Sequence, residues 1–515
     1  MARKNYFDHA LAERLALAAI DAGGGIRARR VLAEALFAQG RSEEAATLLA
    51  AMQQVAADAD QAPIAILRAH TLFWGLGKGL EAEQVITNAD ELLAASNWGD
   101  EGRILRATIA FSRGRTRAAL DDVTPLLKQA SGEPTGLRAL TLATGALAFS
   151  GRPERAAAAA EAALAGSAPT GEASTLASDR LRTALCVAYR LAGRLGDAEL
   201  LAGEGYRAAL DRKARELQAP WALLRGENAL ARGEVESAVQ WLREAAYLLK
   251  ERGWYFGVYS KAWCLGSLAE ARALLGDVEG AEAAVAEADA ATAEQFFIPS
   301  RERGRVWLAA TRGDIATARE LATHAARTAA ELGSHMIEAV GLHDVARLGD
   351  PAAVAPRLRE LAEQLEGRLP GAYAAHAVAM AAGDGSQLDA ASAVFEEIGA
   401  LLLAAEAAAE AARAHDSDRR AISVLAASHR SRSLLGERPI HTPALDLPKS
   451  AVSLTMRERE VALLVAQRLS NREIAGRLVV SVRTVDSHLQ RIFEKLHIGR
   501  REDLAALFDQ GPDLD

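Results

Sequence analysis

A glycine followed five residues later by an alanine recurs along the first four-fifths of this chain, each time between two amphipathic helical patterns. The pairs are Gly40/Ala45, Gly77/Ala82, Gly114/Ala119, Gly151/Ala156, Gly193/Ala198, Gly233/Ala238, Gly276/Ala281, Gly313/Ala318 and Gly385/Ala390. Successive glycines up to Gly313 are 37, 37, 37, 42, 40, 43 and 37 residues apart, and Gly349 follows 36 residues later with Val354 replacing the alanine. Such regularity indicates a solenoid of helical repeats.

The chemistry of the unit explains its pattern. Glycine adopts the left-handed conformation that ends one helix, and a small alanine lets the next helix pack closely against the first. The composition favours helix formers, with 5% aromatic residues and 14 prolines in 515 residues, so we expect an all-α fold. Around Gly233 and Gly276 the turn resembles that of tetratricopeptide repeats, although those have a period of about 34 residues.

Arrays of this kind form a curved surface with a long groove that binds peptides, proteins or small effectors. The candidate effector site is an aromatic cluster within ten residues, formed by Trp254, Tyr255, Phe256, Tyr259 and Trp263. The alternative is that these rings fill an enlarged core between two repeats, which is what buried aromatic side chains most often do.

Three prolines, Pro439, Pro443 and Pro448, end the helical pattern. Prolines at this density disfavour a helix and favour an extended tether. We therefore predict a repeat domain over residues 1–435, a proline-containing linker over 436–452 and a second domain over 453–510.

The second domain begins with two capping boxes. In Thr455–Glu458 and again in Ser470–Glu473, a hydroxyl and a carboxylate can exchange hydrogen bonds with the first-turn amides of a helix. Val479 and Val480 then form a turn, Ser481 caps a third helix from Val482 to about Leu496, and a fourth helix is expected over about 502–508.

The third helix is amphipathic. Val485, Leu489, Ile492 and Leu496 recur at helical spacing and predict one buried side. The opposite side carries hydrogen-bonding and cationic groups suited to base edges and phosphates in the major groove.

These residues closely resemble the LuxR-type helix-turn-helix, in the segments Leu454–Val461, Ser470–Ala475 and Ser481–Leu496. The resemblance implies a double-stranded DNA partner, with Asp486, Ser487 and Gln490 on the base-reading face. It places Arg472, Arg483, Thr484, His488, Arg491 and Lys495 where contacts to the DNA backbone are expected. It also makes Leu504 and Phe508 candidates for dimer contacts. Arg468 and His497 depart from the family pattern, because each stands where a glycine is common.

Single residues have alternative roles. His488 can hydrogen-bond within the domain instead of contacting a phosphate, and Asp486 repels DNA except where it accepts from a cytosine amino group. As a whole, the block can instead be a helical bundle that binds only protein.

Charge agrees with the DNA interpretation. The whole chain carries −8, whereas residues 452–510 hold ten lysines and arginines against eight aspartates and glutamates, a net +2. The array also resembles the rear part of large MalT-like LuxR regulators, whose front part binds ATP. This sequence contains no phosphate-binding Gly-rich loop and no alternating strand and helix pattern of a receiver domain.

We expect neither enzymatic activity nor a cofactor, because no motif for a nucleophile or a metal ion is present. Cys186 and Cys264 are far apart and are expected to be buried free thiols. No signal peptide or membrane-spanning stretch is recognisable, so a cytoplasmic location is expected.

The sequence thus predicts a transcription regulator whose repeat array binds a protein or small-molecule effector and controls promoter binding. A homodimer and a contact with RNA polymerase are further candidates. The alternative is an interaction scaffold in which the helix-turn-helix is vestigial or serves assembly only.

Overall fold

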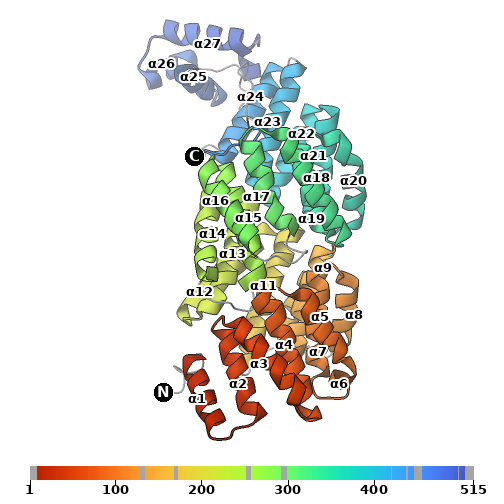
Figure 1. The fold of residues 1–515 in the computed structure, drawn as a ribbon. Coiled ribbons are helices and arrows are strands. Elements are labelled where there is room, and N and C mark those ends of the chain that lie inside the picture. Colours follow the sequence, from red (N-terminus) through yellow and green to blue (C-terminus); the bar gives the residue numbers. More distant parts are fainter. Residues whose placement is uncertain are drawn as a thin grey trace. The chain divides into compact units, whose positions relative to one another are not determined.

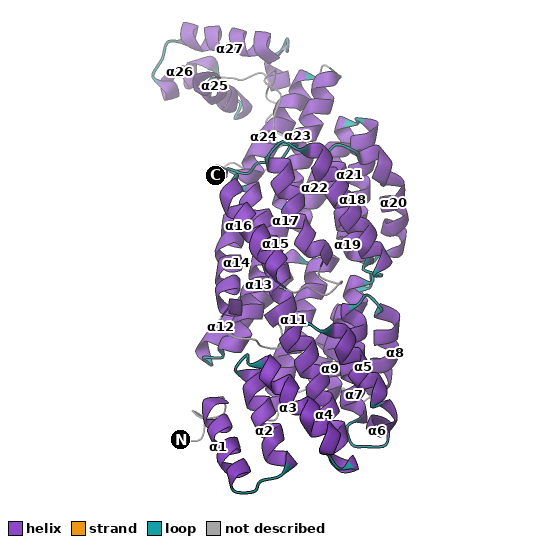
Figure 2. Cartoon of the chain, viewed as in Figure 1, coloured by secondary structure: helices purple, strands orange, loops and turns teal. Residues whose placement is uncertain are grey.

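In the computed structural model, the described residues are 9–127, 134–166, 172–250, 257–291, 298–418, 420–436, 439–445, 455–496 and 498–504. Helices and their connections account for all of these residues, and no strand occurs among them (Figure 2). The predicted all-α class is therefore confirmed. The chain divides into two compact units, residues 1–374 and 375–515, which we describe separately.

The first unit is a series of helical hairpins that follow one another along the chain (Figure 1). Its first part contains α1 (His9–Asp21), α2 (Ile26–Ala38), α3 (Ser42–Val55), α4 (Asp58–His70), the π-helical turn η2 (Thr71–Gly75), α5 (Gly79–Asn88), α6 (Asp90–Ala94), α7 (Gly99–Ser112), α8 (Thr116–Leu127), α9 (Pro134–Phe149) and α10 (Pro153–Gly166). Its second part contains α11 (Glu172–Ala192), α12 (Leu195–Asp211), α13 (Arg215–Arg232), α14 (Val235–Lys250), α15 (Gly257–Leu274), α16 (Val278–Ala290), α17 (Ile298–Thr311), α18 (Ile315–Glu331), α19 (His335–Arg347), α20 (Pro351–Gln364) and the start of α21 (Arg368–Ala382). These hairpins confirm the predicted solenoid of tetratricopeptide-like repeats.

The glycine and alanine of each repeat have the expected roles. Every glycine of the pattern from Gly40 to Gly349 has a positive φ, between 66° and 105°. The alanines from Ala45 to Ala318 are completely buried, and Val354 is 7% exposed. In each hairpin a left-handed residue therefore ends the first helix. A small buried residue in the first turns of the second helix lets that helix pack against the first.

The prediction is wrong for the last pair of the pattern, Gly385/Ala390, because neither residue has the role expected of it. Gly383, with φ +64°, is the left-handed residue there, and Gly385 is the first residue of α22 (Gly385–Ile398). Ala390 is exposed, whereas Leu388 is 2% exposed and takes the buried position. The motif is thus shifted by two residues, because Asp384 rather than Gly385 caps α22 by accepting from the amides of Ser386 and Gln387.

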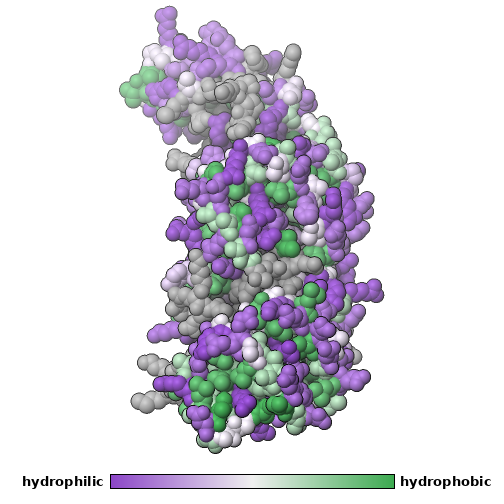
Figure 3. All heavy atoms as spheres, viewed as in Figure 1, coloured by the Kyte–Doolittle hydropathy of each residue, from purple (hydrophilic) through white to green (hydrophobic). Residues whose placement is uncertain are grey.

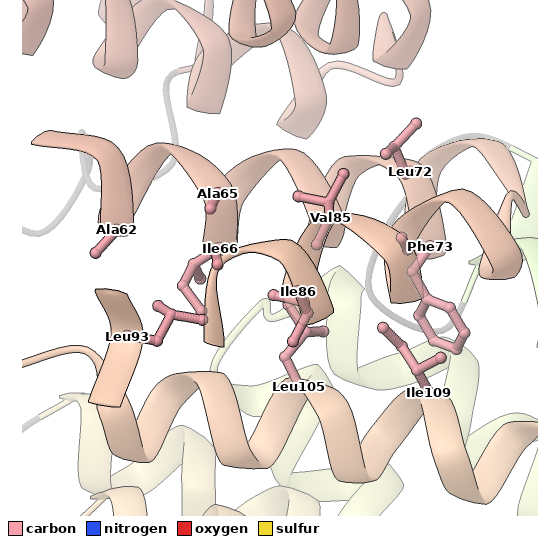
Figure 4. Close-up of a cluster of buried hydrophobic side chains, with 13 residues drawn as sticks. Ala62, Ala65, Ile66, Leu72, Phe73, Val85, Ile86, Leu93, Leu105 and Ile109 are labelled. Atoms are coloured by element: carbon pink, nitrogen blue, oxygen red, sulfur yellow. The ribbon is translucent and has the colours of Figure 1, made fainter. Parts of the chain in front are cut away.

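Apolar side chains between neighbouring hairpins form the core of the first unit. In the cluster of Figure 4, Ile66 and Phe73 lie with Ile86 against Leu105 and Ile109, from α4, η2, α5 and α7. Burying such side chains stabilises the fold by about 1.5–3 kcal/mol for each fully buried one. Each hairpin therefore depends on its neighbours for most of its stability.

Repeats that are distant in sequence also touch within the first unit. The amide of Glu366 donates to the carbonyl of Gly151 at 2.9 Å, and Arg155 Nε lies 2.9 Å from Glu366 Oε1. Leu365 packs on Gly151, and Leu332 packs on Gly114. Segments near residues 332 and 365 therefore close against loops that lie more than 200 residues earlier in the chain.

We predict that Gly151→Ala destabilises the first unit by about 2–3 kcal/mol. Part of this cost is the left-handed backbone, and part is the overlap of the new methyl group with the Leu365 side chain. Gly349→Ala is the control, because Gly349 also has a positive φ but has no atom within 4 Å of the added methyl group. Thermal unfolding should show a clearly larger loss for Gly151→Ala, and equal losses would contradict the packing contribution.

The second unit contains α22, α23 (Leu401–Ser417), α24 (Ala421–Leu435), α25 (Met456–Ala466), α26 (Asn471–Leu478) and α27 (Val482–Leu496). The end of α21 also belongs to this unit, and its buried His376 Nε2 lies 2.6 Å from the buried Glu410 Oε2 of α23. The buried His415 Nε2 of α23 lies 2.8 Å from Oδ2 of the partly exposed Asp389 of α22.

The beginning of the predicted linker packs against the helices that precede it. Residues 439–445 are not helical, as expected, but Ile440, Thr442 and Ala444 are buried, and Arg413 donates to the carbonyl of Ala444 at 2.7 Å. Part of the tether is therefore fixed on α23.

Two further expectations concern single residue types. Cys186 and Cys264 are free and buried, and burial raises the pKa of the Cys186 thiol to about 12.

Over the described ranges, no helix combines the length and apolar character that crossing a bilayer requires.

Candidate nucleic-acid interface

Helix α25 begins with the predicted capping box. The amide of Thr455 donates to Glu458 Oε2 at 2.7 Å, and the amide of Glu458 donates to Thr455 Oγ1 at 3.3 Å. Glu458 is 3% exposed and also accepts from Lys495 Nζ at 2.6 Å. Burial disfavours the carboxylate, but the hydrogen bonds from Lys495 and Thr455 outweigh it and lower the pKa of Glu458.

Helix α26 begins with the second predicted box. Ser470 Oγ accepts from the amide of Glu473, and the Glu473 carboxylate accepts from the amide of Ser470 at 2.7 Å. The Ser470 hydroxyl also donates to the Glu473 carboxylate at 2.6 Å. The hydrogen bonds from this hydroxyl and from the amide of Ser470 lower the pKa of Glu473. Arg468 adopts φ +60°, as expected of a residue that replaces the usual glycine, while His497 lies outside the described residues.

The turn between α26 and α27 is strained. Val479 ends α26 with φ +53° and is 90% exposed, so a β-branched residue occupies the left-handed region without any packing in return. The sequence places this turn correctly but does not reveal its handedness.

We predict that Val479→Gly stabilises the helix-turn-helix by about 1 kcal/mol, because glycine relieves the left-handed strain and little burial is lost. Val482→Gly is the matched control, since Val482 is also partly exposed but lies in the first turn of α27. That control should lower stability by up to about 1 kcal/mol, as glycine does in helices. Opposite shifts in the unfolding temperature are expected, and a loss of stability in Val479→Gly would contradict the interpretation.

Helix α27 spans Val482–Leu496, as predicted, and its two sides differ sharply. Val485, Leu489 and Ile492 are at most 5% exposed and pack on Val461 and Ile474 from the two preceding helices. The opposite side is polar and open to solvent. One face of α27 therefore holds the domain together, while the other is available to a partner.

The residues proposed to contact DNA fall into two groups. Exposed ones are Arg472, Arg483, Asp486, Ser487, Gln490 and Arg491, and half-buried ones are Thr484, His488 and Lys495. Several already have partners within the domain: Ser487 Oγ donates to the carbonyl of Arg483 at 2.9 Å, and Gln490 Nε2 donates to Glu494 Oε1 at 3.3 Å.

The half-buried residues Thr484 and His488 have environments within the domain that bear on their proposed roles. Thr484 completes the cap of α27, because its amide donates to Ser481 Oγ at 3.1 Å. Nδ1 of His488 is buried and has no hydrogen-bond partner within the described part of the chain. The intradomain hydrogen bond that we considered for His488 is therefore not made by this nitrogen.

A relay of hydrogen-bonded side chains behind Asp486 was not predicted from the sequence. Asn471 Nδ2 donates to Asp486 Oδ1 at 2.5 Å, and Arg501 donates both to Asn471 Oδ1 and to the carbonyl of Leu469. Arg501, Asn471 and Asp486 belong to three separate segments, so no local spacing signals the relay. It holds one oxygen of the Asp486 carboxylate and leaves the other for a partner.

The candidate dimer contacts differ in what the structure describes. Leu504 is fully buried in the core of its own domain, so its side chain presents no surface to a second copy. Phe508 lies outside the described residues.

The candidate effector cluster is only partly described. Trp254, Tyr255 and Phe256 lie outside the described residues, and the side chain of Tyr259 is likewise not described. Trp263 on α15 is half-buried and lines a cavity of about 60 Å³ together with Arg190, Glu227, Glu270 and Arg303.

Those charged residues belong to a buried ladder in the first unit. Arg303 Nη2 lies 3.0 Å from Glu270 Oε1 and Arg303 Nε lies 2.9 Å from Asp344 Oδ2, while Arg190 Nη1 lies 3.4 Å from Glu227 Oε2. Burial, opposed by Arg303, raises the pKa of Glu270 to about 7. A charged residue on an otherwise apolar helix in successive repeats is the sequence signal that could have revealed the ladder.

The C-terminal geometry is that of a helix-turn-helix, with α26, a tight turn and an exposed polar face on α27. Residues 452–508 match the family described as bacterial regulatory proteins of the luxR family. This segment is therefore a LuxR-type DNA-binding domain, carried by a chain of tetratricopeptide-like helical repeats.

Curated relatives match in the same region. A putative HTH-type transcriptional regulator of Mycobacterium tuberculosis is 50% identical over 52 residues, which are 10% of this chain and 6% of that protein. The tetrathionate response regulatory protein of Salmonella typhimurium is 44% identical over 57 residues, 11% of this chain and 28% of that protein. The matches thus span only a small part of these relatives.

Among solved structures, the chain is similar to the APC/C hetero-tetramer Cut9–Hcn1. The TM-score is 0.44 at 14% sequence identity, over 83% of this chain and 78% of that one.

Proposed function

We propose that this protein is a cytoplasmic, sequence-specific transcription regulator whose repeat array binds an effector or protein partner and thereby controls promoter binding. The observation that carries the proposal is the exposed polar face of α27. The opposite face of the same helix packs into the core of the domain. A helix presented in this way fits the major groove of DNA.

We assign Asp486, Ser487 and Gln490 to base edges. Their support is that all three are exposed on α27. Arg472, Arg483 and Arg491 are exposed cations and are assigned to phosphates, where they position the domain and release counterions. Thr484, His488 and Lys495 are half-buried and are likewise assigned to the DNA backbone.

The test is a selection of genome fragments by the purified full-length protein. A variant with Arg483→Ala, Ser487→Ala and Gln490→Ala is compared with Arg327→Ala, which removes an exposed arginine of the array. We expect wild type and Arg327→Ala to enrich one discrete site and the triple variant to enrich none. Enrichment by the triple variant, or failure of all three proteins and of the isolated fragment 450–515 to enrich any site, would contradict the proposal.

The array is proposed to act on the DNA-binding domain through charge. Residues 452–510 carry +2 in a chain of −8, so the rest of the chain is acidic and can compete with DNA for the basic domain. The isolated fragment 450–515 should then bind DNA more tightly than the full chain, most clearly at low salt. Equal affinities would remove this masking mechanism.

The second candidate function is an interaction scaffold. The observation that favours it is the extent of the repeat array, which fills the whole first unit. Phosphate contacts make affinity for DNA fall steeply with salt, so a salt-independent association with DNA would favour the scaffold. A homodimer and RNA polymerase remain proposed partners, and selection of a two-fold-symmetric site would support the dimer.

A further inference from the structure

A pocket of about 320 Å³ lies between the N-terminal repeats of the first unit. Its walls come from α2, α4 and the start of α7, and the lining residues include Phe37, Ala38, Ile66, His70, Trp98 and Glu101. The volume is in the range of small-molecule sites, which are mostly apolar with a few polar groups. Figure 3 shows a mostly hydrophilic face whose larger apolar patches lie over these N-terminal repeats.

The floor of the pocket is anchored in the packed core. Ile66 lines the pocket and is 6% exposed within the cluster of Figure 4. Phe37 is 8% exposed and meets His70 edge to face, with ring centroids 5.7 Å apart. Rings held in this way provide a rigid surface for another flat ring.

The charges around the pocket balance one another. Glu101 accepts two hydrogen bonds from Arg138, and Arg30 Nε, which is buried, lies 3.6 Å from Glu34 Oε1. Burial, and then the charges of Arg138 and Arg180, lower the pKa of His70 to about 3, so its imidazole is neutral near pH 7. A charged ligand would lose hydration here without meeting a net opposite charge.

We infer that this pocket binds an uncharged, flat, largely apolar ring compound, and that it is the effector site of the repeat array. The inference rests on the proposed function, in which the array takes an effector. Trp98, which is 36% exposed, lines the pocket and supplies a partly exposed aromatic ring.

The experiment is a calorimetric titration of the full-length protein without DNA, using three naphthalene probes of matched shape. They are the neutral 2-naphthol, the anionic 2-naphthoate and the cationic 2-naphthylmethylammonium. We expect 2-naphthol to bind with one site per chain and at least about tenfold more tightly than either charged probe. Tighter binding of a charged probe, or no binding of 2-naphthol, overturns the inference.

Two substitutions locate the probe. Ala38→Phe fills the pocket from a half-buried position, and Leu80→Phe adds a ring on a side chain that is 68% exposed and does not line the pocket. Ala38→Phe should weaken 2-naphthol binding at least about tenfold, and Leu80→Phe should leave it unchanged. Equal binding by the two variants overturns the assignment.

Trp98→Ala is a second variant in case Ala38→Phe does not fold. It removes the partly exposed ring from the pocket lining and should weaken 2-naphthol binding by about tenfold, while unchanged affinity counts against the pocket. Because no DNA is present in these titrations, their failure leaves the genome-fragment selection standing and rejects the ligand site alone.

Discussion

Glu458→Ala is expected to lower the free energy of unfolding of the helix-turn-helix by about 2–3 kcal/mol. The buried carboxylate accepts from the amide of Thr455 and from the ammonium of Lys495, and alanine leaves both donors without this acceptor. Lys495 is 36% exposed, so water partly replaces the lost contact and the cost stays below that of a fully buried ion pair. Hydrogen exchange of α25 and α27 in the full-length protein measures the effect.

Glu460→Ala is the control for this substitution. Glu460 pairs with Arg457 at 2.7 Å on the same helix, but both side chains are about 40% exposed. Such a surface pair contributes about 0–1 kcal/mol. If Glu460→Ala destabilises the domain as much as Glu458→Ala does, the buried contact with Lys495 is not the cause.

The same carboxylate makes stability depend on pH. The pKa of Glu458 is lower in the folded domain than its ordinary value of 4.5. Its contribution is therefore fully present above the unfolded pKa, and it is lost as the pH falls through the folded pKa. Glu458→Gln should be less stable than wild type near pH 7, and the difference should shrink as the pH falls below 4.5.

Asn471→Ala is expected to relax base discrimination about tenfold at the base pair that Asp486 is proposed to read, with little change in affinity for random DNA. The amide of Asn471 fixes one carboxylate oxygen of Asp486, and a well-placed base contact discriminates by about 1–3 kcal/mol. A binding-site selection with the variant measures the preference at each position.

Arg472→Ala is the comparison for Asn471→Ala, because the two residues are adjacent on α26 and Arg472 is exposed. Loss of a phosphate contact should weaken binding to all sequences and reduce the salt slope by about one. A uniform loss of affinity in Asn471→Ala, without a change in base preference, would contradict the positioning role of the relay. Circular dichroism checks that both variants are folded.

Local patterns made most of the helix-turn-helix predictable. Both capping boxes and the span of α27 follow from residues within one or two turns of each other, since hydrogen bonds at helix starts and apolar periodicity are local. The left-handed glycines of the array were predictable for the same reason, and the displaced pair at Gly385 shows how a second glycine two residues away misleads the pattern.

Contacts between distant segments could not be predicted. The contact of the Lys495 ammonium with Glu458, 37 residues earlier, has no local signal in the sequence. Similarly, Arg501 reaches Asn471 and Leu469 across the domain. The pocket beside Phe37 and Trp98 combines three helices whose spacing depends on how the repeats wind, and no single repeat encodes that winding.

The contact between Gly151 and Glu366 changes how the first unit should unfold. A linear repeat array can fray from either end, since each repeat is held only by its neighbours. Here the segment at 365–367 is also bonded to the loop at 151–155, more than 200 residues earlier. Release of the later repeats must therefore expose earlier ones, so loss of structure at one end is coupled to the middle. The unit should melt in fewer and sharper steps than its number of repeats suggests.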